Sequence, residues 1–228
     1  MLETINEHIY GLGGDLYMPG GVHFPVRMTI VRMPDNRLWL HSPVAIDDAM
    51  AAEINKLGEV AWLVAPNLLH HLYFKKAAAR WPSAKTYCSP GLESKRKDIV
   101  FDHVLNELPA EWGDAFDMLR VDGVPKINEC VFLHKQSQTL VVTDLVFNIA
   151  EPRGWQSWLL LTMAGVKGRY GQSRVWRLFT KDRKAAGRTI LQMLNWNFES
   201  VVMAHGAVVR SNAKQRTREG LHWMLRGL

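Results

Sequence analysis

Apolar residues recur with strand and helix periods in the first third of the chain. Residues 26–33, "VRMTIVRM", alternate and are rich in branched side chains, and a Pro-Asp-Asn turn separates them from the short run 37–43, so the two runs predict a β-hairpin. Residues 44–57 carry apolar side chains at helical spacing, and Gly58 ends the predicted helix. The run 60–65 is apolar throughout, as in a strand buried on both faces.

The middle of the chain continues this alternation of strands and helices. Residues 68–80 predict a helix and 84–90, "AKTYCSP", a strand, which gives the βαβ order of a layered α/β domain. Residues 128–134 and 138–143 are apolar runs on either side of "KQS" and predict a second hairpin.

The last third is mostly helical. Residues 153–195 predict a basic helical section, "ESVVMAHG" at 199–206 returns to strand, and a final helix is expected at roughly 211–226. No repeat, low-complexity tract or linker interrupts the chain, and 47% of its 228 residues are hydrophobic. We therefore predict one α/β (α+β) domain that spans residues 1–228.

Composition narrows the class of protein. The formal net charge of +6 and the pI of about 9.4 are compatible with acidic partners, but no Lys/Arg block has the length of a binding tail, so solvated helices are the simpler explanation. The N-terminus lacks the apolar core of a signal peptide, and the longest apolar run, 158–166, is about half of a membrane span. Cys88 and Cys130 fit no CxxC pattern. We expect a cytoplasmic protein with reduced thiols.

Three predicted strands end in side chains that bind metals. "VAPNLLHH", "LVVTD" and "VVMAHG" place His70, His71, Asp144 and His205 a few residues beyond a hydrophobic run, with Asn67 beside them. The carboxyl edge of a layered α/β sheet is where sites form. If the strands are neighbours, these nitrogen and carboxylate ligands converge and suit zinc, iron or manganese.

Each candidate also has a structural interpretation. Adjacent residues on a helix point about 100° apart, so His70 and His71 rarely bind one ion, and one of them can cap the helix while the other packs. Asp144 can form an Asx-turn after its strand. His205, before Gly206, can be a hydrogen-bonded core histidine. The pattern has less specificity than a full HExxH motif.

The same segments carry a family resemblance. The chain resembles the DUF4336 family, which is related to the metallo-β-lactamase superfamily, over about residues 17–224. The most specific pieces are "SPV", "APNLLHHLYF", "SPGL", "TLVVTDLVFN" and "AHGAVV". The resemblance implies an αββα sandwich of metallo-β-lactamase type, with a helical insertion at about 153–195.

The ligand motif of that superfamily is degenerate here. HxHxDH falls on Pro66, Leu68, His70 and His71, so the first two ligands are absent and His70 stands where an aspartate is usual. The later aspartate of the superfamily matches Asp144, and no histidine stands in "DGVPKINE", where another ligand is expected.

The resemblance thus implies a reduced set of metal ligands. The last histidine of the superfamily matches His205, which leaves His71, Asp144 and His205 as the implied ligands, all from the half-site of the second metal. His70 is the implied catalytic residue, as a further ligand or a proton shuttle. Asn67 and Glu129 are the available substitutes. This set suits one ion with an open water position.

Two functions stay open at this stage. The first is a mononuclear metal-dependent hydrolase, with one Zn (or Fe/Mn) ion, acting on an anionic small molecule that the basic section favours. The second is a non-catalytic binding protein that has lost the two-metal site. Nucleic acid is not the expected partner, although the basic section leaves nucleic-acid binding as a weaker third hypothesis. The sequence does not determine the oligomeric state.

Overall fold

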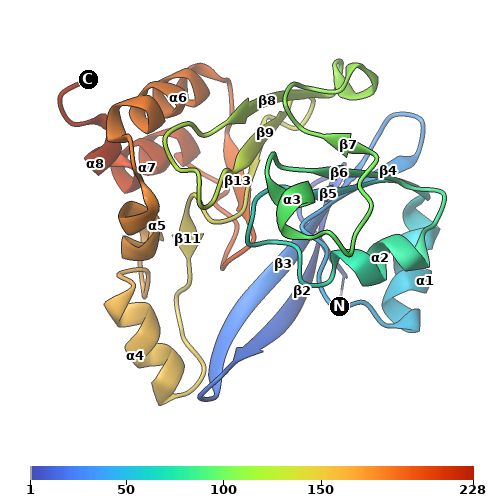
Figure 1. Cartoon of the computed structure of the whole chain (residues 1–228), viewed down its shortest axis with the longest axis horizontal. Coiled ribbons are helices and arrows are strands. Elements are labelled where there is room, and N and C mark those ends of the chain that lie inside the picture. Colours follow the sequence, from blue (N-terminus) through green and yellow to red (C-terminus); the bar gives the residue numbers. More distant parts are fainter. Residues whose placement is uncertain (1) are drawn as a thin grey trace.

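The fold has four layers, with two β-sheets face to face and helices outside each of them (Figure 1). The computed structural model describes residues 2–228. The first sheet has the strand order β1-β2-β3-β4-β5-β6-β7 and the second β13-β10-β9-β8, while β11 and β12 form a separate pair. This is the predicted αββα sandwich.

The first sheet joins an antiparallel half to a parallel half. Its strands are β1 (Leu2–Thr4), β2 (Ile9–Met18), β3 (Val22–Arg32), β4 (Arg37–His41), β5 (Glu59–Ala65), β6 (Lys85–Cys88) and β7 (His103–Val104). Strands β1 to β4 pair antiparallel, and β4 to β7 pair parallel. The predicted hairpin is β3–β4, and the predicted βαβ unit is β5–α2–β6, so both predictions are confirmed.

The second sheet closes the sandwich. Its strands are β8 (Phe116–Arg120), β9 (Cys130–His134), β10 (Thr139–Val142) and β13 (Ser200–Met203). The predicted second hairpin is β9–β10, and β13 adds parallel to β10. The small pair β11 (Phe147–Asn148) and β12 (Tyr170–Gly171) lies beyond it.

Helices cover the outer face of each sheet. Outside the first sheet lie α1 (Asp48–Leu57), α2 (Phe74–Arg80) and α3 (Leu92–Lys95). On the other side of the molecule (Figure 1) lie α4 (Trp155–Met163), α5 (Arg174–Phe179), α6 (Arg183–Asn195), α7 (Ala213–Gly220) and α8 (His222–Leu225). A 3-10 turn covers Ala110–Trp112.

The core explains why several strands are apolar at every position. On β5, Trp62 points into an aromatic cluster between the sheets, while Leu63 packs toward the outer helices. On β10, Val141 faces the same inner cluster and Leu140 faces α6. Both faces of these strands are buried, so side-chain alternation does not produce polar alternation.

Two predicted elements differ in detail, and one strand was not predicted. The section 153–195 is mostly helical as expected, but its last helix α6 buries Ile190 and Met193 against the second sheet, so it belongs to the outer layer of the sandwich. The helix predicted at 211–226 divides into α7 and α8. Strand β2 was not expected, because the glycines of "IYGLGGDLYM" hide its alternation.

No helix among residues 2–228 combines the length and the apolar character that crossing a bilayer requires.

Burial of His134 makes the fold acid-sensitive. Its side chain is 1% exposed on β9, and burial, followed by the charge of His8, lowers the pKa of His134 to about 4. The unfolded chain therefore binds this proton first, and stability is lost as the pH falls from about 6.5 to about 4. In urea titrations across this range, we expect His134→Gln to lose up to about 2–3 kcal/mol less stability than the parent chain.

The exposed His222 provides the control, and His222→Gln is expected to keep the pH dependence of the parent chain. Equal slopes for the parent and His134→Gln would show that His134 is not the group responsible.

Candidate metal site

Four strands end at one edge of the sandwich and deliver polar side chains there. Ser42 follows β4, and His70 follows β5, both in the first sheet. Asp144 follows β10, and His205 follows β13, both in the second sheet. Of the three strands that we expected to be neighbours, only β10 and β13 pair, and the β5 loop reaches them from the opposite sheet.

Asn67 shapes the loop that carries His70. Its Oδ1 accepts the backbone N–H groups of Leu69 and His70, each at 2.8 Å. Its Nδ2 donates to Thr143 Oγ1 at 2.9 Å and to Asp144 Oδ2 at 2.8 Å, across the junction of the two sheets. Because the Asn67 side chain holds these turns, the helix predicted from residue 68 begins only at Phe74.

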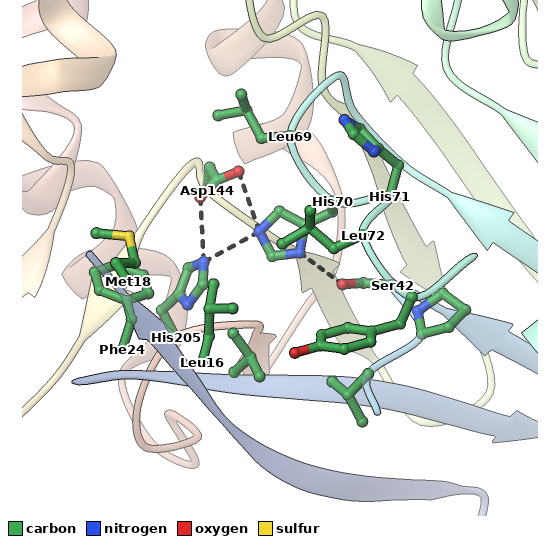
Figure 2. A pocket seen from close by; sticks show the side chains of 14 residues that line it. Leu16, Met18, Phe24, Ser42, Leu69, His70, His71, Leu72, Asp144 and His205 are labelled. Carbon is green, nitrogen blue, oxygen red and sulfur yellow. Dashed lines mark hydrogen bonds and ion pairs between the residues drawn. The ribbon is translucent and has the colours of Figure 1, made fainter. Parts of the chain in front are cut away.

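His70, Asp144 and His205 meet at one point (Figure 2). The two Nε2 atoms of His70 and His205 are 3.1 Å apart. Asp144 Oδ2 lies 3.2 Å from the Nε2 of His70, and Oδ1 lies 3.2 Å from the Nε2 of His205. The carboxylate thus spans both rings, and a ligand atom from each side chain lies within 4.8 Å of the others.

The remaining ring nitrogens have partners in the protein. His205 Nδ1 donates to the carbonyl oxygen of Pro25 at 2.8 Å, so the Nε2 of the neutral ring is bare. His70 Nδ1 lies 2.6 Å from Ser42 Oγ. Metal-binding histidines typically use their second nitrogen in this way, which fixes the direction of the first.

Aromatic rings enclose His205. Phe147 stacks on its ring at a centroid distance of 5.0 Å, with 6° between the planes. Phe24 meets it edge-on at 4.6 Å. The side chain of His205 is 4% exposed. These contacts restrict the ring to one orientation and keep water from its faces.

Glu129 supports the site through the backbone and is not part of the His70–Asp144–His205 cluster. Its fully buried carboxylate accepts the backbone N–H of Thr143 at 2.7 Å and that of Asp144 at 3.1 Å. Burial, and then the Asp144 charge, raise the pKa of Glu129 to about 7. Glu129 therefore fixes the end of β10, and Asn67 fixes the Asp144 carboxylate, so both expected substitute ligands act as supports.

The charges of the cluster are unequal. Burial opposes ionisation of Asp144, but the neighbouring His70 and His205 lower the pKa of Asp144 well below its ordinary range. Burial also disfavours charge on His70, yet the Asp144 carboxylate raises the pKa of His70. Burial lowers the pKa of His205, and Asp144 only partly offsets it. The site therefore combines an ionised carboxylate, an imidazole that favours a proton and one that does not.

His71 lies outside the cluster, as Figure 2 shows. Its Nδ1 accepts from Arg96 at 2.7 Å, and Arg96 also donates to its carbonyl oxygen. Burial, followed by the charges of Lys95 and Arg96, lowers the pKa of His71 to about 4. Of the four residues expected at the site, the structure brings together His70, Asp144 and His205, with His70 where we expected His71.

A largely apolar cavity of about 220 Å³ adjoins the cluster, and Figure 2 shows the side chains that line it. The β2–β3 hairpin contributes Leu16, Met18, Phe24 and Val26, and the loop after β5 contributes Leu69, His71, Leu72 and Tyr73. No Lys or Arg of the described residues lines the cavity, including those of the basic section. Ser42 belongs to the segment "SPV" that carries the resemblance, but neither its contact with His70 nor the hairpin wall of the cavity was predicted.

Sequence comparison assigns the family. The profile of a domain of unknown function, DUF4336, matches residues 16–155. The chain belongs to the DUF4336 family. Among curated proteins, none matches this DUF4336 chain.

Solved structures similar to the DUF4336 chain are metallo-β-lactamases. The DIM-1 enzyme, in a crystal exposed to ceftazidime, has a TM-score of 0.66 at 14% identity, over 98% of this chain and 96% of that one. FIM-1 from Pseudomonas aeruginosa, in its mono-zinc form, has a TM-score of 0.62 at 13% identity, over 99% of this chain and 93% of that one. A metallo-β-lactamase from Hirschia baltica has a TM-score of 0.65 at 13% identity, over 99% of this chain and 95% of that one. At these identities the likeness establishes the fold alone.

The donor set of the DUF4336 chain fits one metal ion. Zinc–ligand bonds of 2.0–2.1 Å in a tetrahedral site separate neighbouring donors by roughly 3.3 Å. The observed spacings of 3.1 and 3.2 Å are close to this value. Two imidazoles and a carboxylate are ligands that zinc, iron and manganese accept. Pro66 and Leu68 stand where the resemblance places the first two histidines of HxHxDH, so these two positions offer no ligand to a second ion.

The Asn67 amide is expected to stabilise the junction of the sheets. Asn67→Ala removes four hydrogen bonds and leaves buried partners unpaired, so we expect a loss of about 2–4 kcal/mol in the free energy of unfolding. Urea unfolding at pH 7 measures it. The exposed Asn106 supplies the matched control, and Asn106→Ala should change stability by less than about 0.5 kcal/mol. Similar losses in both variants would contradict the bridging role.

Proposed function

We propose that this chain is a mononuclear metal-dependent hydrolase. The observation that carries the proposal is the meeting of two imidazole Nε2 atoms and one carboxylate on the floor of a cavity. Each ring has its other nitrogen engaged by the protein, so both Nε2 atoms are directed at the same place. A core histidine with a purely structural role needs only its own hydrogen bonds. It does not require a second imidazole and a carboxylate at the same point.

The proposed ligands are His70, Asp144 and His205. His70 takes the ligand role that the resemblance assigned to His71, and its own alternative role as a proton shuttle is thereby given up. The ion is zinc, or iron or manganese. The mono-zinc form of FIM-1 is a precedent for one ion on this fold.

The chemistry follows from the ligands and the cavity. When bound, such an ion lowers the pKa of a water molecule toward neutrality and supplies a nucleophile. The Asp144 carboxylate supplies the negative charge that compensates the ion, while Ser42 and the Pro25 carbonyl hold the two imidazoles in place. Phe24 and Phe147 exclude water from one side of the site.

The cavity wall favours a different substrate from the anionic small molecule that we predicted from the basic section. No residue of that section lines the cavity, and a bound ion would polarise a carbonyl group. The apolar side chains above it favour a substrate that also has an apolar body. The proposed substrate is therefore an ester, thioester or lactone of a medium-length apolar acid.

Metal content tests the ligand assignment. Protein purified without chelator is expected to bind about one equivalent of zinc, iron or manganese per chain. His205→Gln should lower the affinity for added zinc at least about a hundredfold, because it removes one of three ligands. Elemental analysis and competition with a chromophoric chelator measure both quantities.

His71→Gln is the matched control, because His71 lines the same cavity and lies outside the cluster. It should keep the metal content of the parent chain, and thermal unfolding of all variants checks that they fold. Less than about a tenth of an equivalent, with no uptake on titration, would refute the metal site.

Ester hydrolysis tests the reaction. The zinc-loaded chain is expected to cleave p-nitrophenyl hexanoate with a higher kcat/KM than the acetate, because the longer acyl group buries more apolar surface. Leu72 lines the cavity and is 58% exposed, so Leu72→Ser should raise KM for the hexanoate several-fold and leave kcat nearly unchanged. Hydrolysis that survives chelation, or that is equal in His205→Gln, would contradict the proposal.

The alternative is a binding protein without catalysis. It is favoured because a proton on His70 Nε2, which lies 3.1 Å from His205 Nε2 and 3.2 Å from Asp144 Oδ2, supplies hydrogen bonds within the cluster without any ion. Under this alternative the cavity binds an apolar ligand, and His205→Gln changes neither the metal content nor the ligand affinity.

A further inference from the structure

Helix α4 presents a stripe of large apolar side chains to solvent. Its exposed positions are 155, 158, 159, 162 and 163, which form one stripe at helical spacing. Four of the five carry large hydrophobic side chains: Trp155 is 71% exposed, Trp158 49%, Leu159 45% and Met163 64%. The side that faces the protein carries the buried Ser157 and Leu161, so α4 is apolar on its outer side as well as on its inner side. The outer side of a surface helix is normally polar, so this stripe is an unpartnered contact surface.

The exposed apolar surface is concentrated in one section of the chain. Of the eleven exposed large hydrophobic residues among positions 2–228, six lie in the section 153–195. Besides the four on α4, these are Val175 and Leu178 on α5, which are 46% and 82% exposed. Figure 1 shows α4 and α5 one after the other along the same side of the molecule.

The same section carries the positive charge of the protein. It contains nine of the 28 Lys and Arg residues but only one of the 22 Asp and Glu residues, so its net charge is +8 and that of the remaining chain is −2. Apart from Arg153, which pairs with Asp15, no basic side chain of this section forms an ion pair within residues 2–228. Burial, and then the charges of nearby arginines, lower the pKa of Arg177, as expected of cations that lack acidic partners.

Basic and apolar side chains are interleaved at the α4–α5 junction. Lys167 Nζ lies 4.3 Å from the centre of a Trp158 ring. Arg174 Nη1 donates to the carbonyl oxygen of Met163 at 3.2 Å. The cations therefore border the apolar stripe instead of forming a separate patch.

We propose that α4 and α5 dock this protein on an anionic membrane surface. Tryptophan, leucine and methionine on one side of a short helix insert at the level of the lipid headgroups, and neighbouring Lys and Arg pair with anionic lipids. The protein lies on the bilayer and does not cross it, in agreement with the lengths of its helices. This surface does not involve the metal cluster, so the proposal stands independently of the hydrolase assignment.

Two other occupants fit less well. A second copy of the chain would bring two α4–α5 surfaces together, each with four Lys or Arg residues and no Asp or Glu between positions 155 and 179, and like charges in an interface are unfavourable. Nucleic acid would satisfy the cations and stack on Trp155 and Trp158, but it provides no apolar layer to bury Leu159, Met163 and Leu178. An acidic lipid surface provides both the apolar layer and the negative charge.

Vesicle sedimentation of the full chain tests the proposal. We expect binding to vesicles of phosphatidylcholine and phosphatidylserine, weak binding to phosphatidylcholine alone, and a decrease with salt. Trp155→Ser with Met163→Ser should lower the partition coefficient at least about tenfold through lost apolar contact. Arg174→Gln with Arg177→Gln should lower it by a similar factor through lost charge.

Matched controls come from the other side of the molecule. Val100→Ser removes an 88% exposed apolar side chain, and Lys75→Gln with Lys76→Gln removes two charges from α2, and both should bind vesicles like the parent chain. Protein treated with chelator should also bind like the parent, which separates this result from a failure of the metal proposal.

Three results would overturn the membrane proposal. The first is equal sedimentation with neutral and anionic vesicles. The second is a dimer in analytical ultracentrifugation that Trp155→Ser with Met163→Ser dissociates, without a change in vesicle binding. The third is tight binding to a random oligonucleotide that the arginine variants abolish and the serine variants leave intact, with no binding to vesicles.

Discussion

A buried carboxylate at the junction of two sheets is the central constraint of this structure. Asp144 is 7% exposed and ionised, and a buried charge is tolerated only when it is paired and hydrogen-bonded. Two imidazoles and the Asn67 amide supply that compensation. Because these groups come from both sheets, the electrostatic requirement of one side chain also fixes how the two halves of the sandwich meet.

The supports of the site are distributed in the same way. Glu129 holds the backbone before the carboxylate, Ser42 contacts one ring, and the Pro25 carbonyl accepts from the other. Glu129 precedes β9, Ser42 follows β4 and Pro25 lies within β3, so no single segment of the chain can form the site alone. A mutation in any of the loops is therefore expected to affect both the stability and the ligand geometry.

Much of the fold was accessible from the sequence, because both faces of the central strands are buried. The apolar run 60–65 and the hairpin runs at 128–143 produce β5, β9 and β10 where they were predicted. Asp144 and His205 were found for the same reason, since each follows such a run directly. The family resemblance added the sandwich topology, which periodicity alone does not determine.

What the sequence did not reveal depends on long-range contacts. The choice between His70 and His71 is made by Asn67 and Ser42 on one side and by Arg96 on the other. Ser42 and Arg96 lie far from the two histidines along the chain, so spacing does not identify them as partners. Arg96, for example, lies 25 residues after His71. Strand β2 was not predicted, because Gly11, Gly13 and Gly14 interrupt the alternation of apolar and polar residues along it.

The two sides of the long β2–β3 hairpin have different surroundings: one side faces the cavity and the other contacts α4. Leu16 pairs directly with Phe24 on the side of the cavity, whereas Tyr17 pairs with His23, whose backbone N–H donates to Ser157 on α4. Side chains alternate along a strand, so a slip of one residue would exchange the two sides. Natural relatives should therefore tolerate tips that are longer or shorter by an even number of residues in each strand, while odd insertions would turn the cavity wall outward.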